Sequence, residues 1–402
     1  MKISKLVQKI PPSGIRVFFD LVLGMKDVIS LGVGEPDFVT PWNIREKAIF
    51  SLEEGYTSYT SNKGMIELRR EISRYLKNKY SLDYDPEDEI LITVGVSEGY
   101  DLAVRAIVDR GDKVLMQEPA YVSYDPVVTL CGGRAVHIKT KPDNGFKITP
   151  SDIRKNCDKK TKAIVLSYPN NPTGNSYSGK ELKGIAKVVR AKDLVVISDE
   201  IYCDLTYDLE HTPFPTLSGM KERTIYLNGF SKAFAMTGWR IGYACGNKEV
   251  IAAMTKIHQY TMMCVPIMSQ MAAIEALKNG ARSVAEMKRE YARRRGFVIQ
   301  RLNEIGLVCH RPEGAFYAFP SIKRFGLSSL EFSSRLLKEE KVALVPGTAF
   351  GPSGEGYVRI SYATSMERLK EALDRIERFT LRALDKTSPG PRYNLTKRHQ
   401  EL

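Results

Sequence analysis

Short apolar runs alternate with helical patterns between residues 85 and 250. Brief β-rich runs without regular polar alternation are typical of strands buried on both faces, and helical segments between them are typical of crossover connections. The pattern therefore predicts an α/β fold with a mainly parallel sheet. The predicted strands are 89–93, 113–116, 163–167, 194–197 and 224–227, and the clearest predicted helices are 97–108 and 181–190.

The pattern changes after residue 280. A long, highly charged helical pattern covers 283–304, and the runs after it alternate or carry polar residues, as strands of a smaller, partly exposed sheet do. We expect a large domain at 45–282, a smaller α+β domain from 1–44 and 283–383, and a flexible tail at 384–402. The smaller domain is predicted to contain strands at 314–319, 342–345 and 357–362 and helices at 329–340 and 365–382.

Composition excludes several classes of protein. The apolar fraction of 43% is too high for a disordered chain, and no apolar run approaches the length of a membrane span. The N-terminus lacks the pattern of a secretory signal. The six cysteines are scattered without a C-x-x-C pair, which predicts reduced thiols in a cytoplasmic protein and no metal site.

The chain is basic, with 60 Lys and Arg against 47 Asp and Glu and a formal net charge of +13. Such an excess suggests nucleic acid as a partner, but a solvated basic surface around one anion site also explains it. The basic residues form no long run and do not alternate with aromatic residues, which argues against nucleic acid. We interpret most of the excess, including the run 293–295, as solvated surface.

Ligands of open parallel sheets bind at the carboxyl ends of the strands, so the residues there are candidates. Gly95, Val96 and Ser97 lie where a predicted strand turns into a helix, and free backbone N–H groups with the helix dipole favour an anion there. Ser231 adds a hydroxyl, and Arg240 adds a planar cation that suits phosphate oxygens. The strand–Gly–helix turn on its own is also compatible with a simple tight turn.

Other candidates suit a nitrogen heterocycle that carries a carbonyl group. Lys232 lies in a small, apolar stretch near a cationic arginine, where its amine would lose its proton easily and attack a carbonyl. Asp199 ends an apolar strand, so it either pairs with a protonated ring nitrogen or caps a helix. Tyr202 and Asn171 are placed to hold a ring oxygen, and Tyr121 is placed to stack on the ring.

Five ordered segments carry a family resemblance. They resemble the signature segments of class I pyridoxal-phosphate aminotransferases, and the likeness extends over about residues 10 to 380. The resemblance implies a transaminase with the pyridoxal-phosphate-dependent transferase fold, similar to aspartate aminotransferase, and pyridoxal 5′-phosphate as its cofactor. The segments are 31–38 (LGVGEPDF), 169–174 (PNNPTG), 198–202 (SDEIY), 231–242 (SKAFAMTGWRIG) and 357–361 (YVRIS).

The resemblance implies three catalytic residues. Lys232 would attach to the cofactor and move the proton between the substrate Cα and the cofactor. Asp199 would pair with the pyridinium nitrogen. Tyr202, together with Asn171, would hold the ring oxygen, and Tyr121 would take the stacking position.

The resemblance also implies binding residues. The Val96 and Ser97 amides, Ser231 and Arg240 would bind the phosphate. The substrate α-carboxylate would be bound by Arg359, helped by the Gly34 amide and Asn171. Tyr59 would reach the phosphate of a partner subunit, which implies a homodimer with shared sites.

The chain departs from the family at two positions. Position 229 is Gly where many relatives carry a hydroxyl, and position 97 is Ser where some bacterial aspartate aminotransferases carry a lysine for the distal carboxylate. The implied reaction is ping-pong transfer from an L-amino acid, either aspartate or an aromatic one, to a 2-oxo acid such as 2-oxoglutarate. Met262, Met263 and Cys264 would either line the partner's pocket or pack in the core.

Two alternatives to a transaminase remain. A carbon–sulfur β-lyase of the same fold would use the same lysine and arginine, so only the products separate the two enzymes. A non-catalytic DNA-binding regulator would need a helix-turn-helix domain ahead of the resemblance, which begins almost at Met1. We expect small amino acids and 2-oxo acids as ligands, and neither nucleic acid nor membrane as a partner.

Overall fold

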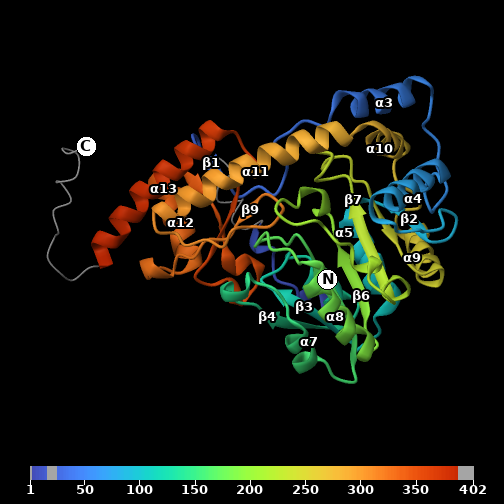
Figure 1. Cartoon of the computed structure of the whole chain (residues 1–402), viewed down its shortest axis with the longest axis horizontal. Helices are drawn as coiled ribbons and strands as arrows, with labels where there is room; N and C mark the ends of the chain where they lie inside the picture. Colours follow the sequence, from blue (N-terminus) through green and yellow to red (C-terminus); the bar gives the residue numbers. More distant parts are fainter. Residues whose placement is uncertain (1, 16–24, 388–402) are drawn as a thin grey trace.

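The helices and strands follow the predicted alternation along the chain. The structure, a computed structural model, describes residues 2–15 and 25–387. Figure 1 shows the large sheet and its helices on one side and the elements of residues 305–387 on the other, with the long helix α11 (Ala281–Glu304) running between them. Among the described residues, no helix combines the length and the apolar character needed to cross a membrane.

The large sheet confirms the predicted α/β fold. In the described part of the chain it has seven strands, in the order β2-β8-β7-β6-β5-β3-β4. Strands β3 to β7 pair in parallel, whereas β8 is antiparallel to both neighbours. The prediction lacks β4, an edge strand with few buried side chains, and β8, a short run after a glycine. The bounds are β2 Ile90–Thr93, β3 Lys113–Glu118, β4 Arg134–Lys139, β5 Thr161–Ser167, β6 Val195–Asp199, β7 Thr224–Gly229 and β8 Gly242–Cys245.

Helices cover both faces of this sheet. Along β5, Ala163 and Val165 pack toward the side of α5 and α9, whereas Ile164 and Leu166 pack toward α7 and α8. This two-sided burial explains why the central strands read as continuous apolar runs. The remaining helices up to α11 are α1 Lys5–Gln8, α3 Trp42–Glu53, α4 Ile66–Tyr80, α5 Gly95–Ile107, α6 Tyr124–Leu130, α7 Pro150–Asn156, α8 Gly179–Ala191, α9 Lys248–Thr261 and α10 Ile267–Asn279.

The strands after α11 are shorter than predicted and belong to two small sheets. The prediction of one strand over 342–345 is wrong, because the chain leaves one sheet at Leu344 and enters another. Strand β10 (Val342–Ala343) pairs with β1 (Ile29–Ser30), and β11 (Val345–Pro346) pairs with β12 (Val358–Ser361). Strand β12 also pairs with β9 (Tyr317–Ala318), and α12 (Ser329–Glu340) and α13 (Met366–Thr387) pack around these strands.

The first strand of the chain joins the C-terminal part of the fold through β10, whereas α3 packs against α10 of the large part. The domain boundaries at 44/45 and 282/283 stay predictions, and the nearest helices begin at Trp42 and Ala281. The predicted tail begins too early, since α13 continues to Thr387. The rest of that tail, 388–402, lies outside the described residues.

The arginine run in α11 corrects the prediction of a solvated surface. Arg294 and Arg295 are buried, and they bind Asp37 and Asp208 respectively at 2.8 Å. Arg293 remains largely exposed and pairs with a glutamate one turn earlier. Consecutive residues of a helix point about 100° apart, so a run of like charge can split between the interior and the surface.

Candidate active site

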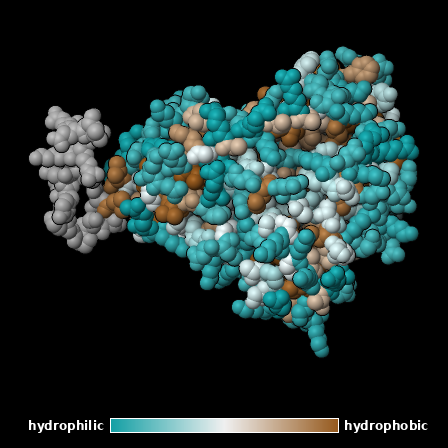
Figure 2. Space-filling view, in the orientation of Figure 1, coloured by the Kyte–Doolittle hydropathy of each residue, from teal (hydrophilic) through white to brown (hydrophobic). Residues whose placement is uncertain are grey.

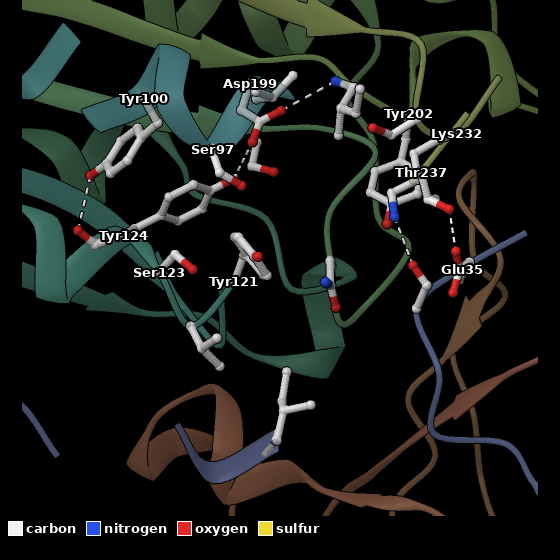
Figure 3. Close-up of a pocket in the computed structure, with 18 of the residues that line it drawn as sticks. Glu35, Ser97, Tyr100, Tyr121, Ser123, Tyr124, Asp199, Tyr202, Lys232 and Thr237 are labelled. Atoms are coloured by element: carbon white, nitrogen blue, oxygen red, sulfur yellow. Dashed lines mark hydrogen bonds between the residues drawn. The ribbon is translucent and has the colours of Figure 1, made fainter. Parts of the chain in front are cut away.

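A cavity of about 550 Å³ lies at the carboxyl ends of the large-sheet strands, where the N-terminal segment and the β9–β12 region approach them. Figure 3 shows Asp199 and Lys232 of the large part together with Glu35 of the N-terminal segment around it. All of the predicted site residues except Tyr59 line this cavity. They are Gly34, Val96, Ser97, Tyr121, Asn171, Asp199, Tyr202, Ser231, Lys232, Arg240 and Arg359.

Lys232 is the amine of the cavity. It follows β7 by three residues, and its Nζ donates a hydrogen bond to the Gly34 carbonyl at 2.7 Å. Burial lowers the pKa of Lys232 to about 8, with Glu35 opposing this shift and the cations of Arg359 and Arg240 adding to it. The amine therefore loses its proton more easily than an exposed lysine does, which is the direction expected from the sequence.

Asp199 ends β6, and its side chain is buried. Burial raises the pKa of Asp199 to about 6, although hydrogen bonds from the Tyr124 hydroxyl (2.7 Å) and the Ile201 amide (3.2 Å) favour its ionised form. The alternative role as a cap of an α-helix is wrong, because a turn and the short 3-10 helix Cys203–Leu205 follow it. This carboxylate faces the cavity, as Figure 3 shows.

The anion-binding candidates meet at the start of α5. The helix begins at Gly95, shortly after β2, and the side chain of its N-cap residue, Val94, does not cap it. A Cβ on Gly95 would lie 2.8 Å from an Nη atom of Arg240, so this guanidinium lies against the helix start. Ser97, in the first turn of this helix, and Ser231 line the same cavity as Arg240. Backbone N–H groups, two hydroxyls and a cation are the donors that phosphate prefers.

Gly229 has a structural explanation at the end of β7. A Cβ at this position would lie 2.9 Å from the Gly242 Cα, and one on Gly242 would lie 2.9 Å from the Val96 amide nitrogen. Strands β7 and β8 and the start of α5 therefore approach each other through backbone atoms. A hydroxyl-bearing side chain at 229 would require these segments to move apart.

Arg359 lies on β12 and is almost fully buried. It donates to the Asn171 side-chain oxygen at 2.8 Å and to the Gly32 carbonyl, and its Nε has no hydrogen-bond partner among the described residues. Its Cζ lies 4.5 Å from the ring centroid of Tyr317 and 4.9 Å from that of Phe350. A buried cation with an unsatisfied donor, held between two rings, is suited to bind a carboxylate.

Three tyrosines that line the cavity, Tyr100, Tyr124 and Tyr317, are not among the residues predicted from the sequence. Tyr124 binds Asp199, and its ring contacts that of Tyr121 edge to face, with centroids 5.6 Å apart. The hydroxyl of Tyr317 lies 2.7 Å from that of Tyr202. The signal for Tyr124 was its position three residues after Tyr121. The segment around Tyr317 was interpreted only as a strand.

Tyr59 is the predicted residue that this chain does not bring to the cavity. Its side chain is 82% exposed. It belongs to the loop before α4, where Asn62 donates a hydrogen bond to the Met263 carbonyl at 2.7 Å. Met262 and Met263 are about half exposed, so they are not packed in the core of this chain.

Known proteins resemble this chain over most of its length. The family model "Aminotransferase class I and II" matches residues 26–376. A putative aminotransferase of Bacillus subtilis, YugH, is 57% identical over 94% of this chain and 98% of its own. An aspartate aminotransferase of Pyrococcus abyssi is 46% identical with the same coverage. A crystal structure of an aromatic aminotransferase from Pyrococcus horikoshii superimposes with a TM-score of 0.87 at 44% identity, over 92% of this chain and 99% of that one.

Proposed function

Because the chain belongs to the class I and II aminotransferases, we propose that it moves the amino group of an L-amino acid to a 2-oxo acid through pyridoxal 5′-phosphate bound in this cavity. The transfer would proceed by ping-pong kinetics in two half-reactions, with 2-oxoglutarate as one acceptor. Aspartate and aromatic amino acids are the proposed donors, since relatives with 44–46% identity carry these two names.

The observation that carries the proposal is the placement of three complementary groups in one cavity. An amine of lowered pKa (Lys232), a buried carboxylate (Asp199) and an anion site at the start of α5 face the same space. They match the carbonyl, the ring nitrogen and the phosphate of the cofactor. When bound, pyridoxal phosphate withdraws electrons from the substrate Cα, which makes the Cα proton labile.

The residues of the chain then have distinct tasks. Lys232 Nζ would hold the cofactor covalently and afterwards carry the proton to and from the substrate Cα, for which a pKa of about 8 is well matched. Asp199 would bind the ring nitrogen and keep it protonated. Tyr202 and Asn171 would donate to the ring oxygen. Arg359 donates a hydrogen bond to the side-chain oxygen of Asn171. The side-chain NH₂ group of Asn171 would therefore be the group that donates to the ring oxygen.

Arg359 and Gly34 would bind the substrate α-carboxylate. The guanidinium is preorganised by Asn171 and Gly32, so little side-chain freedom would be lost on binding. The Gly34 carbonyl holds the Lys232 amine at 2.7 Å. The carboxylate anchor and the amine therefore bind carbonyl groups two residues apart in one loop, and this closeness would bring the Cα of a bound amino acid near Nζ.

A homodimer with shared sites belongs to the same proposal. Figure 2 shows hydrophobic side chains at the surface where Figure 1 places α3 and α10. Exposed aromatic residues on and near these elements are Trp42, Phe50, Tyr56, Tyr59 and Tyr260. Burying such side chains against a second copy of the chain is favourable. In such a dimer, Tyr59 would reach the phosphate of the cofactor bound to the partner subunit. Sedimentation of the purified protein is expected to give twice the mass of the chain, and a monomer at micromolar concentration would contradict the proposal.

Arg240→Ala is expected to weaken pyridoxal phosphate binding by about 10- to 100-fold, because a hydrogen bond to a charged group is lost at the start of α5. Fluorescence titration of the cofactor-free protein would measure this change. Arg223→Ala removes a surface pair with Asp193 and is the matched control, with no expected effect on cofactor binding. A larger change in substrate preference than in cofactor affinity would place Arg240 elsewhere in the mechanism.

The decisive experiment is a half-reaction screen. The purified protein is loaded with pyridoxal phosphate, and its absorbance is followed after addition of aspartate, glutamate, tyrosine, phenylalanine or alanine. At least one of them should convert the yellow form to the pyridoxamine form, and a 2-oxo acid should reverse the change. A protein that takes up no cofactor would refute the assignment, and ammonia with pyruvate from cysteine conjugates would indicate a β-lyase.

We also propose a cytoplasmic location. All six cysteines are free thiols, and three of them are buried. Unpaired thiols are typical of proteins kept in a reducing compartment. Mass spectrometry of the protein isolated without reductant is expected to find every thiol reduced, and a disulfide in the freshly isolated protein would contradict this location.

A further inference from the structure

Tyr317 lies where the ring-oxygen site and the carboxylate site meet. Its side chain is buried on β9, its hydroxyl lies 2.7 Å from the Tyr202 hydroxyl, and its ring supports the Arg359 guanidinium at 4.5 Å. A Cβ on Gly34 would lie 2.6 Å from the Tyr317 hydroxyl, so this oxygen also touches the loop that holds the Lys232 amine. One side chain thus contacts three parts of the site.

A count of protons determines the direction of the Tyr202–Tyr317 hydrogen bond. Burial raises the pKa of both hydroxyls, and Arg359 offsets part of this rise, so both remain protonated at neutral pH. Each phenol has one proton to donate. If Tyr202 donates its proton to the ring oxygen of the cofactor, Tyr317 must be the donor in the hydrogen bond between the two tyrosines, and Tyr202 must be the acceptor.

We propose that Tyr317 is a positioning residue that donates to the Tyr202 oxygen and thereby directs the Tyr202 proton toward the ring oxygen of the cofactor. This inference rests on the proposed function, because the ring oxygen belongs to pyridoxal phosphate. The aromatic ring of Tyr317 has a separate role: it stacks against the guanidinium of Arg359, which would bind the substrate carboxylate. The hydroxyl and the ring can therefore be tested independently.

Loss of the Tyr317 hydroxyl has a spectroscopic consequence. A hydrogen bond donated by Tyr202 stabilises negative charge on the ring oxygen, which is the charge that remains when the lysine-bound cofactor loses its proton. Hydrogen bonds in a chain strengthen one another, so Tyr202 becomes a weaker donor when it no longer accepts from Tyr317. The pH at which the bound cofactor changes its absorbance should then rise.

The test is a pH titration of the absorbance of four loaded proteins: wild type, Tyr317→Phe, Tyr202→Phe and the double variant. Tyr317→Phe is expected to raise the midpoint by about 0.1 to 0.6 unit, because the loss of one hydrogen bond weakens the next bond in the chain by about 10–30%. In the Tyr202→Phe background, the same change should cause no further shift, because the acceptor of the bond is already gone. Tyr226→Phe, at a buried tyrosine away from the cavity, is the control and should leave the midpoint unchanged.

Steady-state kinetics separate the ring from the hydroxyl. Tyr317→Phe keeps an aromatic face under Arg359, so the KM for the amino acid should change by less than about two-fold, whereas Tyr317→Leu should raise it several-fold. A midpoint unchanged by Tyr317→Phe, or an equal shift in both backgrounds, would overturn the inference and leave the proposed function intact. A wild type that takes up no cofactor would overturn both.

Discussion

Lys232→Ala is expected to abolish transamination, with a loss of at least about 10⁴-fold in the rate of the half-reaction. A positioned base contributes rate factors of about 10² to 10⁴, and Lys232 is also the group that would hold the cofactor covalently. Its amine faces the cavity, and its pKa, although lowered by burial to about 8, still lies far above that of protonated water, so water is a much weaker base than Lys232. Stopped-flow absorbance with excess amino acid would measure the loss.

Covalent attachment gives a second measurement on the same variant. Borohydride reduction followed by proteolysis should label the peptide that contains Lys232 in the wild type and leave the variant unlabelled. Lys256→Ala, at an exposed lysine of α9, is the control and should retain both label and activity. A label on another lysine, or wild-type turnover without Lys232, would contradict the assignment of the amine.

The sequence located most of the candidate site because the geometry of parallel sheets is regular. Strands that run the same way end at the same edge, so residues after β2, β5, β6 and β7 had to converge, and Ser97, Asn171, Asp199 and Lys232 line one cavity. The five ordered segments then gave each residue an expected role. Neither argument depends on side-chain packing.

The residues that were missed depend on packing between distant segments. Tyr124 meets Asp199 only because α6 lies over the end of β6, and Tyr317 meets Tyr202 only because β9 lies beside the large sheet. The position of Tyr124 three residues after Tyr121 brings its side chain near the site, but neither contact can be predicted from the local sequence. The division of 342–345 between two sheets has the same origin, because the partner of β10 is β1, more than three hundred residues earlier.

The excess of positive charge also depends on tertiary structure. A count of basic residues does not distinguish a buried ion pair from a solvated surface charge, and Arg295 is buried against Asp208 where the sequence suggested solvent. The cations Lys232, Arg240 and Arg359 all line the cavity, and we propose a different target group of the cofactor or substrate for each of them. The chemical use of the charge is therefore local, and the net charge of +13 does not define a partner.

Arg359→Ala is expected to lower kcat/KM by about 30- to 3,000-fold for amino acids and 2-oxo acids alike, because a buried, preorganised cation that binds the α-carboxylate is lost. All of these substrates carry that carboxylate, so the KM should rise for each of them while their order of preference stays the same. The variant should still take up the cofactor, since Arg359 is assigned to the substrate and not to the phosphate site. Steady-state kinetics with two donors and two acceptors would measure the pattern.

Arg295→Ala is the matched control, because Arg295 is as buried as Arg359 but lies outside the cavity and binds Asp208. Its loss should lower thermal stability and leave the KM values near those of the wild type, since a buried side chain and its hydrogen bonds to Asp208 and the Pro312 carbonyl are lost but no substrate contact is removed. If both variants lose stability and only Arg359→Ala loses substrate affinity, the carboxylate site is assigned. Unchanged kinetics for Arg359→Ala would mean that another group binds the α-carboxylate.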